Sequence, residues 1–404
     1  MRSLALVCCA FIALSIAAHG STYTVTPDGS GDFPTIQAAI ASAIDGDTIE
    51  LADGIFEGDG NRDIDFLGKA VTVRSQSGDA VTCVIDCGGS EIDQHRGFIF
   101  QTDEGPDSAI DGITIMHGWL DASTGTYGGG VFCDDSTSPT ISRCTFYQNT
   151  AAYGGGMRGG LYSTITECSF IENTAVRGGA IGRAPQAVLT DCTFVGNSGT
   201  YGGAIYIRSS CSPTLTGCLF EGNTASHSGG ALHIEQHCDP VLSFCTLTGN
   251  SAPIGGALDV SIESFPTFES CTFAENSCTY TGVISTYEYS LLTFENCLIA
   301  FSPVGSAVSC FDSAVTLSCC DIYGNAGGDW VDYVADQFGV NGNISEDPLF
   351  CGDENPDAPY TLHTDSPCAP VCNPACGLVG AWDTACGATP VEEASWGVIK
   401  ALYW

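Results

Sequence analysis

Apolar and polar positions between residues 141 and 325 follow one pattern that is repeated eight times. Each copy reads apolar-x-x-Cys-x-Phe-x-x-Asn-(Ser/Thr)-Ala with small variations, and a Gly-Gly-(Ala/Gly)-apolar turn follows after a few variable residues. A unit of about 25 residues cannot bury a hydrophobic face by itself, so a constant period indicates stacked repeats. The central cysteines, spaced by 24, 24, 26, 27, 26, 26 and 23 residues, are Cys144, Cys168, Cys192, Cys218, Cys245, Cys271, Cys297 and Cys320.

Within each copy, the residues alternate as they do in a short β-strand. Around Cys192, period two places the cysteine and Phe194 on one face of the strand and Thr193 on the other. The apolar residue three positions before each cysteine has the wrong parity for that face, so we expect a bend or bulge between them. These apolar residues are Ile141, Ile165, Leu189, Leu215, Leu242, Phe268, Phe294 and Leu317.

Two further columns predict the corners of the repeat. Asparagine tolerates the left-handed backbone conformation and glycine adopts it freely, so a recurring position of either type predicts a turn in register. The asparagines are Asn149, Asn173, Asn197, Asn223, Asn250, Asn276 and Asn325, and the glycine pairs are Gly155–Gly156, Gly178–Gly179, Gly202–Gly203, Gly229–Gly230 and Gly255–Gly256. Short strands between such corners predict an all-β fold, a single-stranded parallel β-helix of about twelve coils.

The sequence motif of the repeat resembles those of two known groups of proteins. At the FxxN…GGA(I/L) positions the chain resembles the pectate-lyase-like superfamily of right-handed β-helices, and the same wording is similar to the repeat of polymorphic outer-membrane proteins. The resemblance implies a right-handed solenoid over residues 21–345. It implies much less about function, because one fold carries many functions.

The N-terminal part predicts an export signal and a cap. Residues 1–20 contain an early Arg2, an apolar run and a small-residue end, which is typical of a Sec-type signal peptide. The phrase at residues 28–40, DGSGDFPTIQAAI, predicts a turn and then a short capping helix from Ile36, with Thr35 as its N-cap. The phrase is similar to the opening of pectin methylesterases and other secreted β-helices, which implies a lid over the first coil.

The C-terminal part departs from the repeat. Residues 346–388 hold five cysteines among Pro and Gly, and we expect this Cys-rich segment to close the far end of the solenoid. Residues 389–404 form a tail that resembles those of other secreted β-helix proteins; a sorting signal and a loosely docked end are the two interpretations. No stretch approaches the roughly 18 apolar residues that a membrane span needs. We therefore expect an extracellular protein or one displayed on the outer-membrane surface.

Charge and cysteine content restrict the partners. The chain has 11 Lys and Arg against 47 Asp and Glu, a net charge of −36, with no basic residue between Arg208 and Lys400. Nucleic acid is therefore excluded as an expected partner, and acidic polysaccharides such as polygalacturonate are disfavoured. In-register cysteines point the same way, which suits buried thiols rather than disulfides. Cys83, Cys87 and the C-terminal cysteines are expected to be oxidised in an extracytoplasmic protein.

No metal or cofactor is predicted. One thiol per coil does not give the paired spacing of zinc sites, and His233 and His237 lie on a strand, where they are too far apart to share an ion. The glycine-rich turns lack the GGxGxD motif of calcium-binding repeats. Calcium is left open, without a motif that points to it.

Candidate chemistry lies on the outward face that follows the glycine corner. The first outward column reads Phe132, Arg158, Gly182, Tyr206, His233, Asp259 and Ser285, and the second reads Asp134, Gly160, Ala184, Arg208, Glu235, Ser261 and Tyr287. Five of these side chains would form one solvent-facing patch over three coils: Tyr206, Arg208, His233, Glu235 and Asp259, with Arg158 as a further candidate. Carboxylates, an imidazole, a guanidinium and an aromatic ring suit sugar binding or acid–base chemistry. The alternative is a solvated face on which Arg208 pairs with Glu235.

Two functions follow from these features. We expect a monomeric, secreted or surface-displayed β-helix without catalysis, for adhesion to a polysaccharide or protein or for a structural role. The alternative is a polysaccharide lyase or glycoside hydrolase. The resemblance to pectate lyases implies a basic proton abstractor beside carboxylate-bound calcium, and the chain has no lysine between Lys69 and Lys400. Enzymatic activity therefore stays an open question, with a non-catalytic role favoured.

Overall fold

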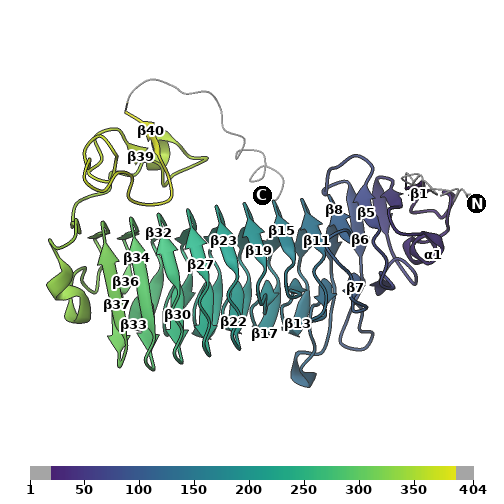
Figure 1. The fold of residues 1–404 in the computed structure, drawn as a ribbon, viewed down its shortest axis with the longest axis horizontal. Helices are drawn as coiled ribbons and strands as arrows, with labels where there is room; N and C mark the ends of the chain where they lie inside the picture. Colours follow the sequence, from purple (N-terminus) through teal and green to yellow (C-terminus); the bar gives the residue numbers. More distant parts are fainter. Residues whose placement is uncertain (1–19, 388–404) are drawn as a thin grey trace, which may run out of the picture.

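The chain winds into a parallel β-solenoid in which each coil stacks in register on the one before it (Figure 1). The structure is a computed structural model that describes residues 20–387. Apart from Gly20, the predicted signal peptide lies outside the described residues, as does the C-terminal tail. Three sheets, here called A, B and C, run along the solenoid axis. No helix among the described residues is long and apolar enough to cross a membrane.

Sheets A and B each take one strand from successive coils. The twelve strands of sheet A are β1 (Thr22–Val25), β2 (Thr48–Leu51), β5 (Thr72–Ser75), β8 (Ala109–Asp111), β11 (Thr140–Ser142), β15 (Thr164–Thr166), β19 (Val188–Thr190), β23 (Thr214–Thr216), β27 (Val241–Ser243), β31 (Thr267–Glu269), β34 (Leu291–Glu295) and β37 (Ala314–Ser318). The eleven strands of sheet B are β3 (Gly54–Phe56), β6 (Cys83–Asp86), β9 (Thr114–Met116), β12 (Thr145–Tyr147), β16 (Ser169–Ile171), β20 (Thr193–Val195), β24 (Leu219–Glu221), β28 (Thr246–Thr248), β32 (Thr272–Ala274), β35 (Leu298–Ala300) and β38 (Asp321–Tyr323).

Sheet C has two limbs, which the glycine corner separates. The first limb comprises β13 (Thr150–Tyr153), β17 (Thr174–Arg177), β21 (Ser198–Tyr201), β25 (Thr224–Ser228) and β29 (Ser251–Ala252). The second limb comprises β4 (Ile64–Asp65), β7 (Phe98–Phe100), β10 (Val131–Cys133), β14 (Met157–Arg158), β18 (Ile181–Gly182), β22 (Ile205–Arg208), β26 (Leu232–Glu235) and β30 (Leu258–Ser261). Two long strands, β33 (Ser277–Tyr287) and β36 (Val304–Phe311), join the limbs near the C-terminal end.

The core holds the predicted ladders of cysteine and phenylalanine. All eight ladder cysteines are buried free thiols. Burial raises the pKa of Cys168, which keeps it a thiol and chemically inert. The rings of Phe146, Phe170, Phe194 and Phe220 stack at successive centroid distances of 4.5, 5.0 and 4.6 Å. The prediction that Cys and Phe share the inner face is therefore confirmed.

The corners are built differently from the prediction. The expected bend before each cysteine is present, because the preceding residue is left-handed, as at Glu167 with φ 53°. At the asparagine corner the left-handed residue is also the one before, such as Glu172 with φ 53°, so the expectation that asparagine itself is left-handed is wrong. In the first glycine pair the register is one residue earlier than predicted: Gly154 (φ 64°) matches Gly178 (φ 63°).

The asparagines instead form a buried hydrogen-bond ladder. Asn173 donates from its backbone N and from Nδ2 to Oδ1 of Asn197, both at 3.0 Å, and its Nδ2 also donates to the carbonyl of Phe146 at 2.9 Å. The same pattern links consecutive ladder asparagines from Asn149 to Asn276, all without solvent exposure. Each side-chain amide thus satisfies backbone groups of the preceding coil and bonds the asparagine of the next coil.

The N-terminal end is covered as predicted. Helix α1 (Ile36–Ser42) begins after Thr35, whose side chain accepts a hydrogen bond from the Ala38 N–H at 3.2 Å. Its apolar face, with Ile36 and Ile40, is buried in the core of the solenoid. A short 3₁₀ turn, η1 (Ala122–Thr124), extends from a loop farther along the chain.

The far end differs from the prediction. Residues 330–344, including η2 (Asp332–Gln337), cover the last coil: Val334 is buried, and Asn343 Nδ2 donates to the carbonyl of Leu317 at 3.0 Å. The Cys-rich segment, with η3 (Gly352–Glu354), β39 (Leu362–His363) and β40 (Thr384–Cys386), lies against the outer face of sheet B instead (Figure 1). There Trp382 Nε1 donates to Thr246 Oγ1 at 2.7 Å.

Within residues 20–387, disulfides are confined to this C-terminal segment and the last coil. Cys319 bonds Cys376, and Cys351 bonds Cys386. The expectation of oxidised Cys83 and Cys87 is wrong, because both are buried free thiols; Cys368 and Cys372 are also free. The two disulfides fasten the segment internally and to the solenoid.

The asparagine ladder predicts a specific cost for its removal. Asn197→Ala would remove the hydrogen bonds that its side-chain amide makes in the core to Asn173, Phe170 and Asn223. We expect the free energy of unfolding, measured by urea titration with circular dichroism, to fall by about 2–3 kcal/mol. The outward Thr190→Ala in the same coil should change it by less than about 0.5 kcal/mol. Equal effects of the two substitutions would contradict the structural role given to the ladder.

Candidate functional site

The candidate residues lie on the second limb of sheet C, just after the glycine corner. Tyr206 pairs in register with His233, and His233 with Asp259. Arg208 pairs with Glu235 in the same way. Both outward columns therefore stand on neighbouring coils in the predicted register, because the coils stack without a slip from β22 to β30.

Both outward columns of side chains point away from the core, but most side chains of the first column have little solvent exposure. Tyr206 and His233 are each 2% exposed, and Asp259 is fully buried. The expectation of five solvent-exposed side chains is wrong for these three. Their cover comes from neighbouring outward side chains and from the first limb: the Tyr201 ring lies 5.5 Å from the ring of His233, and Ser228 Oγ lies 2.9 Å from His233 Nδ1.

A chain of titratable groups, joined by hydrogen bonds and ion pairs, runs through this buried layer. The Tyr206 hydroxyl donates to Glu235 Oε1 at 2.5 Å. His233 lies between two carboxylates, with Nδ1 at 3.0 Å from Asp259 Oδ2 and Nε2 at 3.6 Å from Glu235 Oε2. The Tyr287 hydroxyl donates to Asp259 Oδ2 at 3.4 Å. Three coils are thereby joined by their outward side chains.

The protonation states follow from these contacts. Burial opposes charge on His233, but hydrogen bonds and proximity to Asp259 and Glu235 outweigh it and raise the pKa of His233 to about 9. Burial likewise opposes the Glu235 carboxylate, yet His233, Tyr206 and Arg208 lower the pKa of Glu235 to about 2. At neutral pH the layer holds the His233 imidazolium beside the Glu235 carboxylate.

The first limb adds a column that sequence reasoning missed. Immediately before each glycine corner stand Tyr127, Tyr153, Arg177 and Tyr201, and their side chains meet the second limb across the corner. The rings of Tyr127 and Tyr153 stack with centroids 4.9 Å apart. The recurring phrase Tyr-Gly-Gly, at residues 127, 153 and 201, is the signal in the sequence that indicates this column.

Arginine guanidinium groups lie against tyrosine rings along this corner. The Arg177 guanidinium lies 4.9 Å from the ring centroid of Tyr153, 5.7 Å from that of Tyr201 and 5.8 Å from that of Tyr206. The Arg158 guanidinium lies 5.2 Å from the ring centroid of Tyr127. Such stacking holds the guanidinium planes in fixed orientations without consuming their N–H donors.

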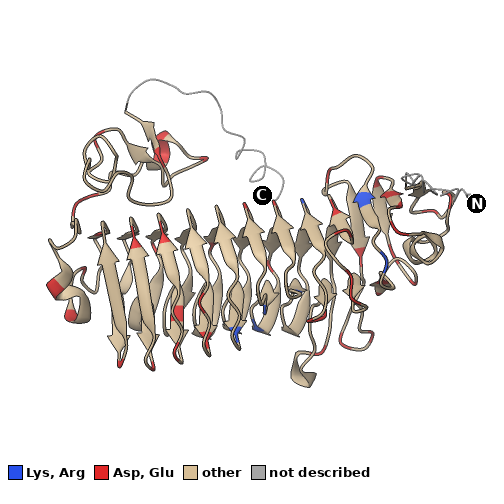
Figure 2. Cartoon of the chain, viewed as in Figure 1, with Lys and Arg blue, Asp and Glu red and all other residues tan. Residues whose placement is uncertain are grey.

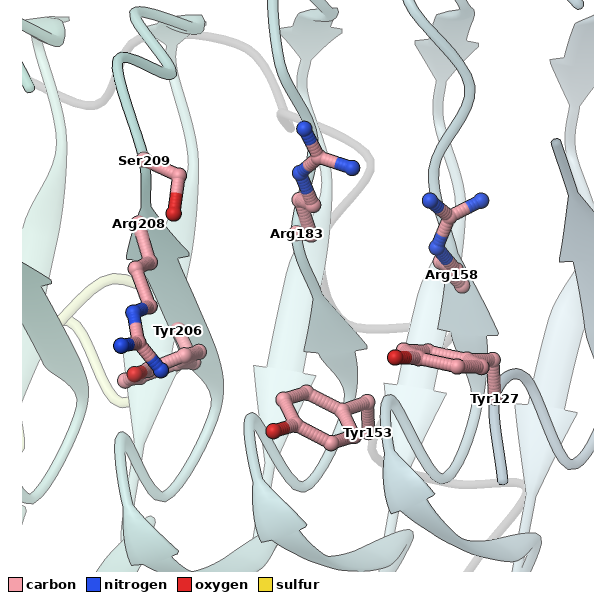
Figure 3. A pocket seen from close by; sticks show the side chains of 7 residues that line it. All are labelled: Tyr127, Tyr153, Arg158, Arg183, Tyr206, Arg208 and Ser209. Atoms are coloured by element: carbon pink, nitrogen blue, oxygen red, sulfur yellow. The ribbon is translucent and has the colours of Figure 1, made fainter. Parts of the chain in front are cut away.

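The corner encloses an open cavity of about 290 Å³, which we call the sheet C groove (Figure 3). Tyr127 and Tyr153 lie along one side of it, and arginines from three successive coils line the rest, as Figure 3 shows. The middle one of these three coils contributes Gly182 to the first outward column. A side chain does not fit there, because an added Cβ would lie 2.2 Å from the Gly154 N. The lining residues are Tyr127, Tyr153, Arg158, Arg183, Tyr206, Arg208 and Ser209.

The carboxylate of Asp135 joins two of these arginines. Asp135 Oδ1 accepts from Arg158 Nη2 at 2.6 Å, and both Asp135 oxygens lie 2.7 Å from Arg183 Nη1. Burial raises the pKa of Asp135, but the hydrogen bonds to Arg183 and the charge of Arg158 outweigh this and lower it overall. Arg183 was not among the predicted residues, because its left-handed backbone (φ 77°) takes it out of strand alternation.

The arrangement suits binding better than acid–base chemistry. A glycosidase needs two carboxyl groups that reach the scissile bond. Here Asp259 is fully buried, and Glu235 is engaged by Tyr206, Arg208 and His233. Among residues 20–387, no group of three His, Cys, Asp or Glu side chains is placed to hold a metal ion. The open groove is lined by tyrosine side chains and guanidinium donors, which are groups that bind.

The coiled architecture and its lateral groove define the class of protein, a parallel β-helix. A family model described as "Right handed beta helix region" matches residues 58–218, 96–273 and 185–345, and the chain belongs to this family. No curated protein matches the sequence.

The comparison with solved structures finds similar chains at low sequence identity. The structure described as pectate lyase Pel9A has a TM-score of 0.53 at 13% identity and covers 91% of this chain and 97% of its own. A pectin methylesterase from carrot gives 0.36 at 13% identity, covering 81% and 89%. A PL6 alginate lyase in complex with a trisaccharide gives 0.38 at 11% identity, covering 76% and 86%. At such identity, the likeness to the pectate lyase shows the fold alone.

The raised pKa of His233 predicts a pH dependence of stability. Its pKa rises from the ordinary 6.5 to about 9 on folding, so its contribution is fully present below pH 6.5 and is lost as pH rises through 9. We expect the free energy of unfolding to fall by on the order of 2–3 kcal/mol across this window. Urea titrations at pH 6, 7.5 and 9.5 should show a smaller decline in His233→Gln. The exposed His237→Gln is the matched control, and an equal decline in both variants would contradict the assignment.

Proposed function

We propose that this chain is a non-catalytic saccharide-binding β-helix of the cell surface or the extracellular space. The observation that carries the proposal is the aromatic platform in the sheet C groove, where Tyr127 and Tyr153 stack at 4.9 Å beside arginine donors. Sugar rings offer apolar C–H faces to aromatic rings and hydroxyls to charged donors, so this combination suits a saccharide. The groove follows the solenoid axis, which suits an extended chain of sugars.

Features of the sequence support the location. The apolar N-terminal segment is typical of an exported protein, and the FxxN…GGA(I/L) wording resembles repeats of polymorphic outer-membrane proteins. The net charge of −36 keeps such a solenoid soluble and separate from other copies. A monomer that presents its groove to extracellular or cell-surface polysaccharide is consistent with these features.

Binding is favoured over catalysis for a specific reason. Of the two carboxylates of the predicted patch, Asp259 has no exposed surface and Glu235 is held by three neighbours. Neither is placed to protonate or attack a sugar in the groove. The proposal therefore assigns these groups to the support of Tyr206 and leaves contact with the ligand to the tyrosines and arginines.

Replacing a platform tyrosine should weaken saccharide binding. A glycan array would first identify a saccharide that the wild-type chain binds, and isothermal titration would then compare the variants. We expect Tyr153→Ala to weaken binding about tenfold, because ring stacking is lost. Tyr333→Ala, an exposed tyrosine at the far end of the solenoid, is the matched control and should bind like wild type.

Two results would count against the proposal. If Tyr153→Ala and Tyr333→Ala bind equally well, the ligand does not use the sheet C groove. If the chain releases new reducing ends or unsaturated products from the saccharide it binds, the function is enzymatic.

A further inference from the structure

We infer that the saccharide bound in the sheet C groove is sulfated, and that the arginines of its cavity receive the sulfate half-ester. This inference rests on the proposed function and names its ligand class. It reverses the expectation from net charge, under which acidic polysaccharides are disfavoured. The reversal comes from the distribution of charge, which the sequence alone does not place in space.

Basic side chains gather at the groove. Of the nine Lys and Arg within residues 20–387, five lie along the corner of sheet C: Arg96, Arg158, Arg177, Arg183 and Arg208. Figure 2 shows how sparse basic residues are elsewhere on the solenoid. The cavity arginines pair with Asp134, Asp135 and Glu235, yet they place most of the basic side chains of a chain of net charge −36 around one groove. Such a site favours an anionic group that fits within it.

The arginines keep donors for a ligand. Arg208 uses Nε for its bond to Gln236 Oε1 at 2.8 Å and for its ion pair with Glu235 at 3.2 Å. Arg183 contacts Asp135 through Nη1, and its Nε is buried without a hydrogen-bond partner in the protein. Because a guanidinium carries five N–H donors, both side chains can also bind a group in the cavity.

The number of donors at the cavity distinguishes sulfate from carboxylate. A carboxylate has two oxygens in one plane, and Asp135 shows that two arginines satisfy it. The cavity is lined by arginines on three successive coils, 158, 183 and 208, together with the Ser209 hydroxyl. A sulfate half-ester presents three terminal oxygens in a tetrahedral arrangement, which gives Arg183, Arg208 and the Ser209 hydroxyl one acceptor each. Arg158 stays bonded to Asp135 and to a backbone carbonyl at the side of the cavity. The stacked Tyr127 and Tyr153 then receive the sugar ring that carries the ester.

The test uses one polymer backbone with three kinds of substituent. Dextran, carboxymethyl dextran and dextran sulfate of matched length and substitution are titrated against the chain at physiological salt. We expect dextran sulfate to bind at least about tenfold more tightly than carboxymethyl dextran, because the third sulfate oxygen accepts one more charge-assisted hydrogen bond. Arg208→Gln and Arg183→Gln should each lose about tenfold in affinity for dextran sulfate. Arg143→Gln, which removes an exposed arginine paired with Asp111 outside the groove, should bind like wild type.

The possible outcomes separate this inference from the proposed function. Equal affinity for the carboxymethyl and sulfate forms overturns the sulfate assignment, as does an equal loss in Arg143→Gln. Single-stranded DNA that binds as tightly as dextran sulfate would indicate unspecific attraction of polyanions and also overturns it. If neutral saccharides bind through Tyr153 and sulfation adds nothing, the proposed function stands and the inference fails. If no saccharide binds at all, both fail.

Discussion

The structure depends on the hydrogen-bond ladder of buried asparagines. Each ladder amide bonds to the asparagine of the next coil and to a backbone carbonyl, so that one side chain fixes the turn and the spacing of two coils. A buried amide without partners is costly, which makes any slip of register unfavourable. The stacked phenylalanines and thiols then fill a core whose shape the ladder has already set.

Strict register is what creates the groove. Tyr127, Tyr153 and Arg208 are separated by up to about eighty residues in the chain, yet they line one cavity because each stands at a fixed place in its coil. The left-handed glycine corner folds the two limbs of sheet C toward each other, and the outward side chains on both sides of the corner converge. The buried chain from Tyr206 to Asp259 then holds the floor of the groove in place.

Much of this fold can be predicted from the sequence, and the site only in part. Periodicity gave the solenoid, the inner face of Cys192 and Phe194, and the pairing of Tyr206 with His233, since register follows from the repeat. The solvent exposure of the outward side chains could not be predicted, because it depends on the angle between the two limbs of sheet C. The left-handed Arg183 breaks strand alternation, and the position of the Cys-rich segment on sheet B depends on contacts such as Trp382 with Thr246.

The most direct test of this account is a crystal structure of the chain with a bound sulfated oligosaccharide. The account predicts a sugar ring against Tyr127 or Tyr153, with its sulfate oxygens within hydrogen-bond distance of Arg183 and Arg208. A saccharide bound on the outer face of sheet A or sheet B, with the sheet C groove empty, would contradict it.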